Sequence, residues 1–213
     1  MIFKENNPFR IIRRLRQIYN INFIAKGIRL SPSSDRVYRK INEGMVWFNR
    51  NFPKKRKPDV WLMYLIFFLS SLKIRTLKKM LNDYAFFRSD RVRIICFAKR
   101  SSSLIKRLKR KTISPVQIHQ LLEPLSYEVI LLCQAASGDR VVKQRIAEFF
   151  LEHHHKQIYI TGDDLLSLGI KPGPEFKKIF QRVLRSKLNN KINTKKQELD
   201  YVKRIIRSYH KQT

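Results

Sequence analysis

The sequence predicts an all-α protein built from many helices of about two to four turns. Apolar residues recur at helical spacing in almost every segment, and residues that start helices precede them, as in Ser114-Pro115-Val116-Gln117. The run Ile158-Tyr159-Ile160 is the only short stretch with a β-like pattern. We therefore expect helices along most of the chain, without a regular repeat.

The composition predicts a folded protein with a polyanionic partner. The chain has 213 residues, 43% of them hydrophobic, which is enough for one domain or two small ones with a real core. Its formal charge is +30, from 46 Lys and Arg against 16 Asp and Glu, and such self-repulsion favours binding to a polyanion. Basic and apolar residues are interleaved, so we expect basic faces on folded helices. Nucleic acid is the first candidate partner, and an anionic membrane surface is the second.

Sequence signals in the first half of the chain mark where helices begin and where a loop separates them. Pro8 follows Asn6-Asn7 and can occupy the first position of a helix that continues to Tyr19. Ser33-Ser34-Asp35 can cap a second helix. Residues 53–58 read as a basic loop bounded by prolines, and the apolar run that starts at Val60 predicts a buried helix over residues 60–72. This run is far shorter than the roughly 20 residues of a membrane span.

The second half is punctuated in the same way. Ser137-Gly138 separates two helices, and Thr194-Lys195-Lys196-Gln197 has the form of a capping box that starts the last helix. The remaining expected helices cover residues 73–82, 89–100, 101–110, 125–136 and 139–154.

Residues for catalysis or metal binding are sparse. No Asp-x-Asp or Glu-x-Glu pair occurs, although two metal ions at a nucleotidyl-transfer site need paired carboxylates. Asp163-Asp164 stands where carboxylates cap a helix start. His153-His154-His155 would point about 100° apart on a helix and so would not converge on one ion, which favours a helix end. We expect no catalytic and no metal-binding residue in this chain.

The cysteines and the N-terminus indicate a reducing, cytoplasmic location. Cys96 and Cys133 lie inside apolar stretches and read as buried thiols, with a disulfide the less favoured alternative. The N-terminus is polar and Arg-rich, without the apolar stretch of a signal peptide.

The segment over residues 160–176, Ile-Thr-Gly-Asp-Asp-Leu-Leu-Ser-Leu-Gly-Ile-Lys-Pro-Gly-Pro-Glu-Phe, reads as two helices joined by a tight Gly/Pro turn. It resembles the tail signature of class II tRNA nucleotidyltransferases and bacterial poly(A) polymerases. The resemblance extends to the preceding Leu121-Leu122-Glu123-Pro124-Leu125-Ser126 and to residues 194–204. It implies a helical array with a neck over residues 1–50, a body over 51–157 and a basic tail over 158–213.

Two N-terminal segments are similar to neck motifs of the same family. Asn6-Asn7-Pro8-Phe9-Arg10 resembles the Glu-Asp-Pro-x-Arg motif, whose polar residues read the incoming base in the family. Arg10 is kept, while amides at Asn6 and Asn7 add a donor where a carboxylate only accepts. Alternatively, the two asparagines only cap the first helix. The segment over residues 33–41, Ser-Ser-Asp-Arg-Val-Tyr-Arg-Lys-Ile, resembles the second neck motif, Ser-x-Glu-Arg-Ile-x-x-Glu-Leu. Arg36 matches and Asp35 keeps the acidic character, whereas Lys40 reverses the sign of a position that is usually acidic.

The resemblance implies that the tail holds RNA, in particular the acceptor stem and elbow of tRNA. Positions 178, 182 and 185 share one helical face, and the helix start at Gly173 can approach a phosphate. The expected RNA-binding residues are Lys171, Gly173, Lys177, Lys178, Arg182, Arg185, Lys195, Lys196 and Arg204, and we expect the tail helices to present Lys187, Lys203 and Arg207 with them. Alternatively, each charged face is only solvated.

In the family a catalytic head precedes the neck. Because the neck match begins at Asn6, close to Met1, we expect the head to be absent from this chain. Three roles then stay open. The chain is a non-catalytic RNA-binding protein, the RNA-binding subunit of a split enzyme, or a basic scaffold for ribosomal RNA or an anionic membrane. In the second case a separate head would dock on residues 10–19. We expect no cofactor in the chain itself, since Mg²⁺ with ATP or CTP would enter only with a catalytic head.

Overall fold

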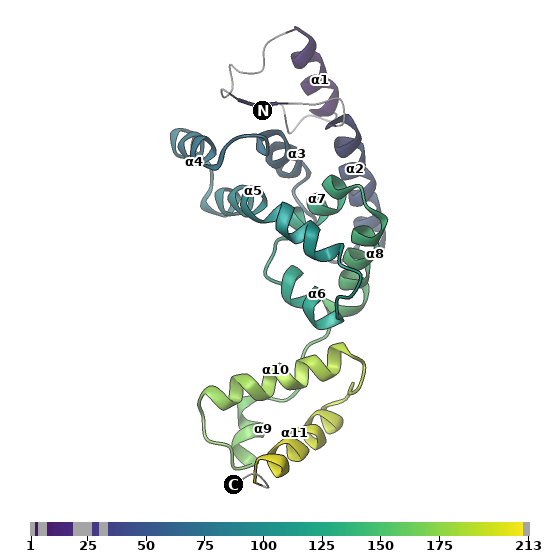
Figure 1. The fold of residues 1–213 in the computed structure, drawn as a ribbon, viewed down its shortest axis with the longest axis vertical. Helices are drawn as coiled ribbons and strands as arrows, with labels where there is room; N and C mark the ends of the chain where they lie inside the picture. Colours follow the sequence, from purple (N-terminus) through teal and green to yellow (C-terminus); the bar gives the residue numbers. More distant parts are fainter. Residues whose placement is uncertain (1–2, 4–7, 19–26, 30–33, 211–213) are drawn as a thin grey trace. The chain divides into compact units, whose positions relative to one another are not determined.

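The computed structural model describes residues 3, 8–18, 27–29 and 34–210. Within these residues the regular elements longer than a single turn are all helices, which confirms the predicted all-α fold (Figure 1). Their order is α1 (Pro8–Ile18), α2 (Ser34–Asn51), α3 (Val60–Leu69), α4 (Ile74–Asp83), α5 (Arg88–Leu108), α6 (Pro115–Leu122), α7 (Tyr127–Ser137), α8 (Arg140–Glu148), a π-helical turn (Phe149–His153), α9 (Gly162–Ser167), α10 (Pro174–Leu188) and α11 (Lys195–His210).

The chain divides into two compact units. Unit 1 comprises residues 1–111 and 121–146, and unit 2 comprises residues 112–120 and 147–213. In the described part of the chain, no helix is long and apolar enough to cross a bilayer. The division into neck, body and tail stays a prediction.

The core of unit 1 forms where α2, α3, α5 and α7 pack together. Apolar residues of α2 recur every three or four positions and bury one face, which holds Ile41, Met45 and Phe48. In contrast, α3 is apolar all round and is buried along nearly its whole length, as predicted for the run that starts at Val60. Aromatic rings contact one another between these helices: the ring centres of Phe48 in α2 and Tyr127 in α7 are 5.2 Å apart.

The basic loop before α3 is held by a buried carboxylate. Glu128 of α7 is fully buried and accepts two hydrogen bonds from the Arg56 guanidinium, at 2.7 and 3.1 Å, and one from the Asp59 backbone N–H at 2.9 Å. Burial by itself raises the pKa of Glu128, but these hydrogen bonds outweigh it and leave the pKa below its usual value. The positive charge of Arg56 in this loop therefore compensates the buried Glu128 carboxylate.

Two predicted helices are one. Residues 88–108 form the continuous helix α5, whereas the sequence suggested a break between Arg100 and Ser101. Serine disfavours a helix interior only weakly and no Gly or Pro interrupts the segment, so packing of Ile94, Phe97 and Leu104 sustains the helix.

The predicted turn between α7 and α8 is present. The Ser126 side chain caps α7 by accepting from the Val129 N–H, and Gly138 ends α7 in the left-handed conformation at φ 60°. Both cysteines are free thiols, with Cys133 buried, as predicted, and Cys96 only half-buried. Burial raises the pKa of the Cys133 thiol to about 12, so it is inert near neutral pH.

Candidate nucleic-acid interface

The tail in unit 2 is organised by the turn between α9 and α10. Thr161 and Asp164 form a reciprocal capping box at the start of α9, so the predicted capping role is confirmed for Asp164. Gly169, at φ 80°, ends α9 in a Schellman motif: its N–H donates to the Leu166 carbonyl and the Ile170 N–H donates to the Leu165 carbonyl. Leu165 and Ile170 then enter the tail core.

A buried ion pair fixes α10 against α11. The Lys187 ammonium lies 2.5 Å from Glu198 Oε1 and 3.4 Å from the centre of the Tyr159 ring. Oε2 of Glu198 accepts from the backbone N–H groups of Tyr159 and Ile160 at 2.7 and 3.0 Å. The expectation that Lys187 faces RNA is therefore wrong, since its side chain is engaged in the fold. Glu198 thereby holds the backbone of Tyr159 and Ile160, and residues 158–160 do not form a strand.

Three of the predicted RNA-binding residues line one groove. Lys178, Arg182 and Arg185 of α10 are exposed and border a groove of about 270 Å³, opposite His119 and other residues of α6. Positions 178, 182 and 185 thus lie on one face of α10. The residues lining the groove are Val116, His119, Gln120, Lys178, Gln181, Arg182, Leu184, Arg185 and Leu188, which include no carboxylate.

Sequence reasoning missed the α6 side of this groove. Val116, His119 and Gln120 share one face of α6 by helical spacing, but no sequence signal pairs that face with α10. The His119 ring also makes an edge contact with the Phe149 ring, with the ring centres 6.0 Å apart. His119 therefore both packs within the fold and lines the groove.

The other predicted RNA-binding residues lie at the surface. Lys171, Gly173 and Lys177 are exposed around the start of α10, and Gly173 has an extended backbone before Pro174. The remaining three are on α11: Lys195, Lys196 and Arg204.

Two residues of α11 already have protein contacts. The Lys195 ammonium lies 2.9 Å from Asp164 Oδ2, and this contact, followed by the Thr161 N–H, lowers the pKa of Asp164. The guanidinium carbon of Arg204 lies over the Tyr201 ring, 5.8 Å from its centre. Arg204 Nε also donates a hydrogen bond to the Asp200 carbonyl at 3.4 Å. A phosphate would compete with these partners.

Three of the predicted site residues in the neck motifs lie within the described part of the chain. Arg10 is exposed on α1, Arg36 is exposed in the first turn of α2, and Asp35 next to it is half-buried. Asn6 and Asn7 lie outside the described residues.

One histidine of the triplet is buried. His153 Nε2 lies 3.0 Å from Glu148 Oε1, which closes the π-helical turn that follows α8. With Glu152 these residues form a group whose ligand atoms all lie within 4.8 Å of one another and which could hold a cation. His154 and His155 are not part of the group, so the triplet does not act as a unit.

The fold is that of the helical region of CCA-adding enzymes. The Thermotoga maritima CCA-adding enzyme complexed with tRNA matches at a TM-score of 0.75 and 21% identity, over 96% of this chain. A CCA-adding enzyme in complex with CTP matches at 0.73 and 21% identity, also over 96% of the chain, and an apo form matches at 0.71 and 22% identity over 94%.

Among curated proteins, the A-adding tRNA nucleotidyltransferase of Geobacter sulfurreducens is 24% identical over 98% of the chain. No protein-family model matches. These findings confirm the resemblance to tRNA nucleotidyltransferases that the sequence motifs predicted.

The match covers only part of each relative. The chain spans 24% of the Geobacter enzyme, 49% of the Thermotoga enzyme and 48% of the CTP-bound enzyme. This partial coverage is consistent with the chain corresponding to a C-terminal region of these relatives.

Proposed function

We propose that the chain is an RNA-binding protein that holds tRNA through the groove between α6 and α10. The observation that carries the proposal is the groove itself, where three exposed cationic side chains meet without a carboxylate. The Thermotoga enzyme, which shares the fold, is complexed with tRNA, and this supports tRNA as the RNA class.

The chemistry of the groove suits a phosphate backbone. Arg182 and Arg185 present planar guanidinium groups that form paired hydrogen bonds with phosphate oxygens, and Lys178 adds a point charge one turn away. Double-helical RNA is recognised mainly by shape and by contacts to phosphates and 2′-hydroxyls. An array of Lys and Arg without base-reading pairs is the kind of surface this recognition needs.

A competition experiment tests the proposal. Fluorescently labelled tRNA is titrated with the full chain at near-physiological salt, and unlabelled tRNA or phosphatidylserine vesicles are added as competitors. We expect tRNA to displace the label at far lower phosphate concentration than the vesicles do. Equal competition by vesicles, or no binding of tRNA, would overturn the proposal and favour a membrane surface or another RNA.

A second candidate role is the RNA-binding subunit of a split nucleotidyltransferase. The observation that favours it is that the solved relatives are about twice as long as the region matched, at 46% to 49% coverage. In either role we propose that the chain itself lacks transfer chemistry and a cofactor, because the sequence has no Asp-x-Asp or Glu-x-Glu pair of the kind that holds two metal ions at a nucleotidyl-transfer site.

The two roles differ in an incorporation assay. The pure chain is mixed with tRNA that lacks its 3′ end, Mg²⁺, ATP and CTP. We expect no incorporation by the chain alone, and robust incorporation would contradict both roles. A polypeptide that co-purifies with the chain and adds nucleotides faster in its presence would establish the split enzyme.

A further inference from the structure

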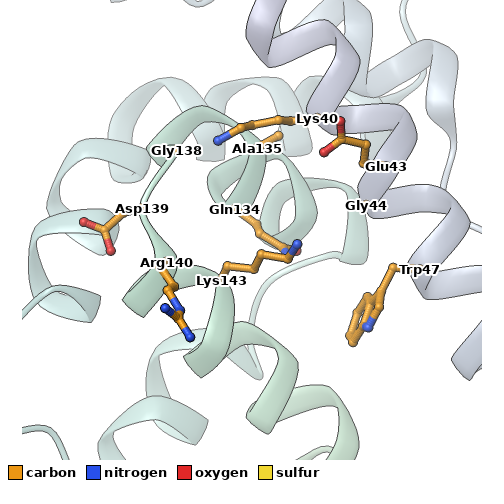
Figure 2. A pocket seen from close by; sticks show the side chains of 10 residues that line it. All are labelled: Lys40, Glu43, Gly44, Trp47, Gln134, Ala135, Gly138, Asp139, Arg140 and Lys143. Atoms are coloured by element: carbon orange, nitrogen blue, oxygen red, sulfur yellow. The ribbon is translucent and has the colours of Figure 1, made fainter.

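A second basic pocket lies in unit 1, built from residues other than those of the tail groove. It has a volume of about 240 Å³ and opens between α2 and the turn that joins α7 to α8 (Figure 2). Lys40, Gly44 and Trp47 line it from one face of α2, and Gln134, Arg140 and Lys143 line it from the opposite side. The sequence assigns no role to any of these residues beyond the sign change at Lys40.

The pocket contains a buried acceptor without a donor. Gln134 is 8% exposed, and its side-chain oxygen has no protein donor within hydrogen-bond distance. A buried carbonyl in this state destabilises the fold unless a partner supplies an N–H or O–H. The oxygen itself is enclosed, but Gln134 lines the pocket, so a rotation of its side chain would let a ligand there donate a hydrogen bond to this oxygen.

The pocket also has an excess of available positive charge. Lys40, Arg140 and Lys143 contribute three cations, against the carboxylates of Glu43 and Asp139. Asp139 is already engaged, because it accepts from the Lys109 ammonium at 3.1 Å and from the Val141 N–H at 2.8 Å. No ion pair among the described residues involves Lys40 or Lys143.

The turn brings one of these cations close to the backbone. Gly138 adopts φ 60°, and a Cβ at this position would come within 3.3 Å of Lys40 Nζ. The Lys40 ammonium therefore lies against the turn, and Figure 2 shows its side chain extending from α2 towards Gly138. An anionic group at the rim would meet this ammonium without rearrangement of the turn.

Trp47 supplies an aromatic wall seven residues further along the same helix face. It is half-buried and held by an edge contact to Phe52, with ring centres 5.9 Å apart. Aromatic rings are the surfaces on which proteins stack unpaired nucleic-acid bases.

We propose that this pocket binds a single nucleotide. The base packs against Trp47 and donates an N–H to the Gln134 side-chain oxygen, and the phosphate lies at the rim near Lys40 and Lys143. At about 240 Å³ the pocket is smaller than the roughly 300–1,000 Å³ of sites that enclose whole drug-sized ligands. It therefore suits one base with its phosphate exposed. The nucleotide is either free or an unpaired residue of a bound RNA.

Tryptophan fluorescence tests the proposal in the full chain. Trp61 of α3 is the other tryptophan, so Trp61→Phe leaves Trp47 as the single reporter. AMP, CMP, a short single-stranded RNA and ribose 5-phosphate are titrated separately. We expect saturable quenching by the mononucleotides or the RNA and much weaker quenching by ribose 5-phosphate. Mononucleotide binding identifies a free nucleotide, and binding of RNA alone identifies an unpaired residue. Equal quenching by ribose 5-phosphate, or no quenching by any probe, would overturn the proposal.

Matched variants separate ligand binding from folding. Gln134→Leu should weaken nucleotide binding by about five- to tenfold, the effect of one lost hydrogen bond, without lowering the melting temperature. Lys40→Ala with Lys143→Ala should weaken it further, while Lys79→Ala, an exposed lysine on α4 outside the pocket, should leave it unchanged. Unchanged binding by Gln134→Leu and by the lysine pair would contradict the proposal. The nucleotide probes do not depend on the groove between α6 and α10. If every pocket variant kept both its nucleotide binding and its tRNA binding, the pocket proposal would be refuted, while the proposed function would stand.

Discussion

Lys187 and Glu198 form an ion pair in which neither side chain is more than 5% exposed, with Nζ and Oε1 2.5 Å apart. The pair joins α10 to α11, and the second carboxylate oxygen fixes the backbone of Tyr159 and Ile160. It therefore sets where the cationic face of α10 lies within the tail. Removing one partner leaves a buried charge uncompensated, which is the costly case for such pairs.

The first prediction concerns this pair. Lys187→Met should lower the free energy of unfolding by about 3 kcal/mol, because the buried Glu198 carboxylate then loses its ion-pair partner and keeps only two N–H donors. Adding Glu198→Gln should restore part of the loss, since the amide oxygen still accepts from the backbone. Urea unfolding of the two single variants and the double variant measures the coupling. Additive losses would show that the two side chains do not interact.

The second prediction concerns acid stability and Glu128. Its pKa is lowered in the fold, although burial opposes this, because Arg56 and the Asp59 N–H donate to the carboxylate. A lowered pKa means that the ionised carboxylate adds stability above the unfolded pKa, about 4.3, and that this stability is lost as pH falls through the folded pKa. Glu128→Gln should cost about 2 kcal/mol near pH 7 and much less in acid. A loss that does not change with pH would contradict the assignment.

The third prediction concerns salt. Each phosphate neutralised by Lys or Arg releases counterions, so the affinity for tRNA should fall linearly with salt on a logarithmic scale. If three groove cations each contact a phosphate, affinity should drop by about four- to sixfold between roughly 100 and 200 mM salt from these contacts alone. Filter binding at several salt concentrations measures the slope. An affinity that does not respond to salt would exclude a phosphate-dominated mode.

The sequence predicted the tail where local rules decide the structure. Asp163-Asp164 was expected to cap a helix start, and Asp164 does so in a capping box with Thr161. The expected Gly/Pro turn begins at Gly169, which has the left-handed conformation. Residues 178, 182 and 185 follow helical periodicity, so their common face could be predicted without a tertiary contact. These features depend only on residues within two turns of one another.

The sequence could not predict what depends on contacts between distant segments. The residues around Lys187 in the sequence do not distinguish it from the exposed cations of α10. Only the tertiary contact with Glu198 of α11 shows that Lys187 is buried. Likewise, the groove needs His119 and Gln120 of α6 to face α10, which no spacing in the sequence indicates. The continuous helix α5 was also missed, because weak helix formers at Ser101 to Ser103 looked like a boundary that packing overrides.

Removal of the groove cations gives the sharpest test of the proposed RNA-binding surface, with tRNA affinity as the readout. A variant with Lys178→Ala, Arg182→Ala and Arg185→Ala is compared with Arg75→Ala, Lys78→Ala and Lys79→Ala, which removes the same charge from exposed positions of α4. Circular dichroism confirms equal helix content in both variants. We expect the groove variant to lose at least about tenfold in affinity and its salt slope to fall by about two, with far smaller effects in the α4 variant. Equal affinities for the two variants would contradict the assignment of the α6–α10 groove as the RNA-binding surface.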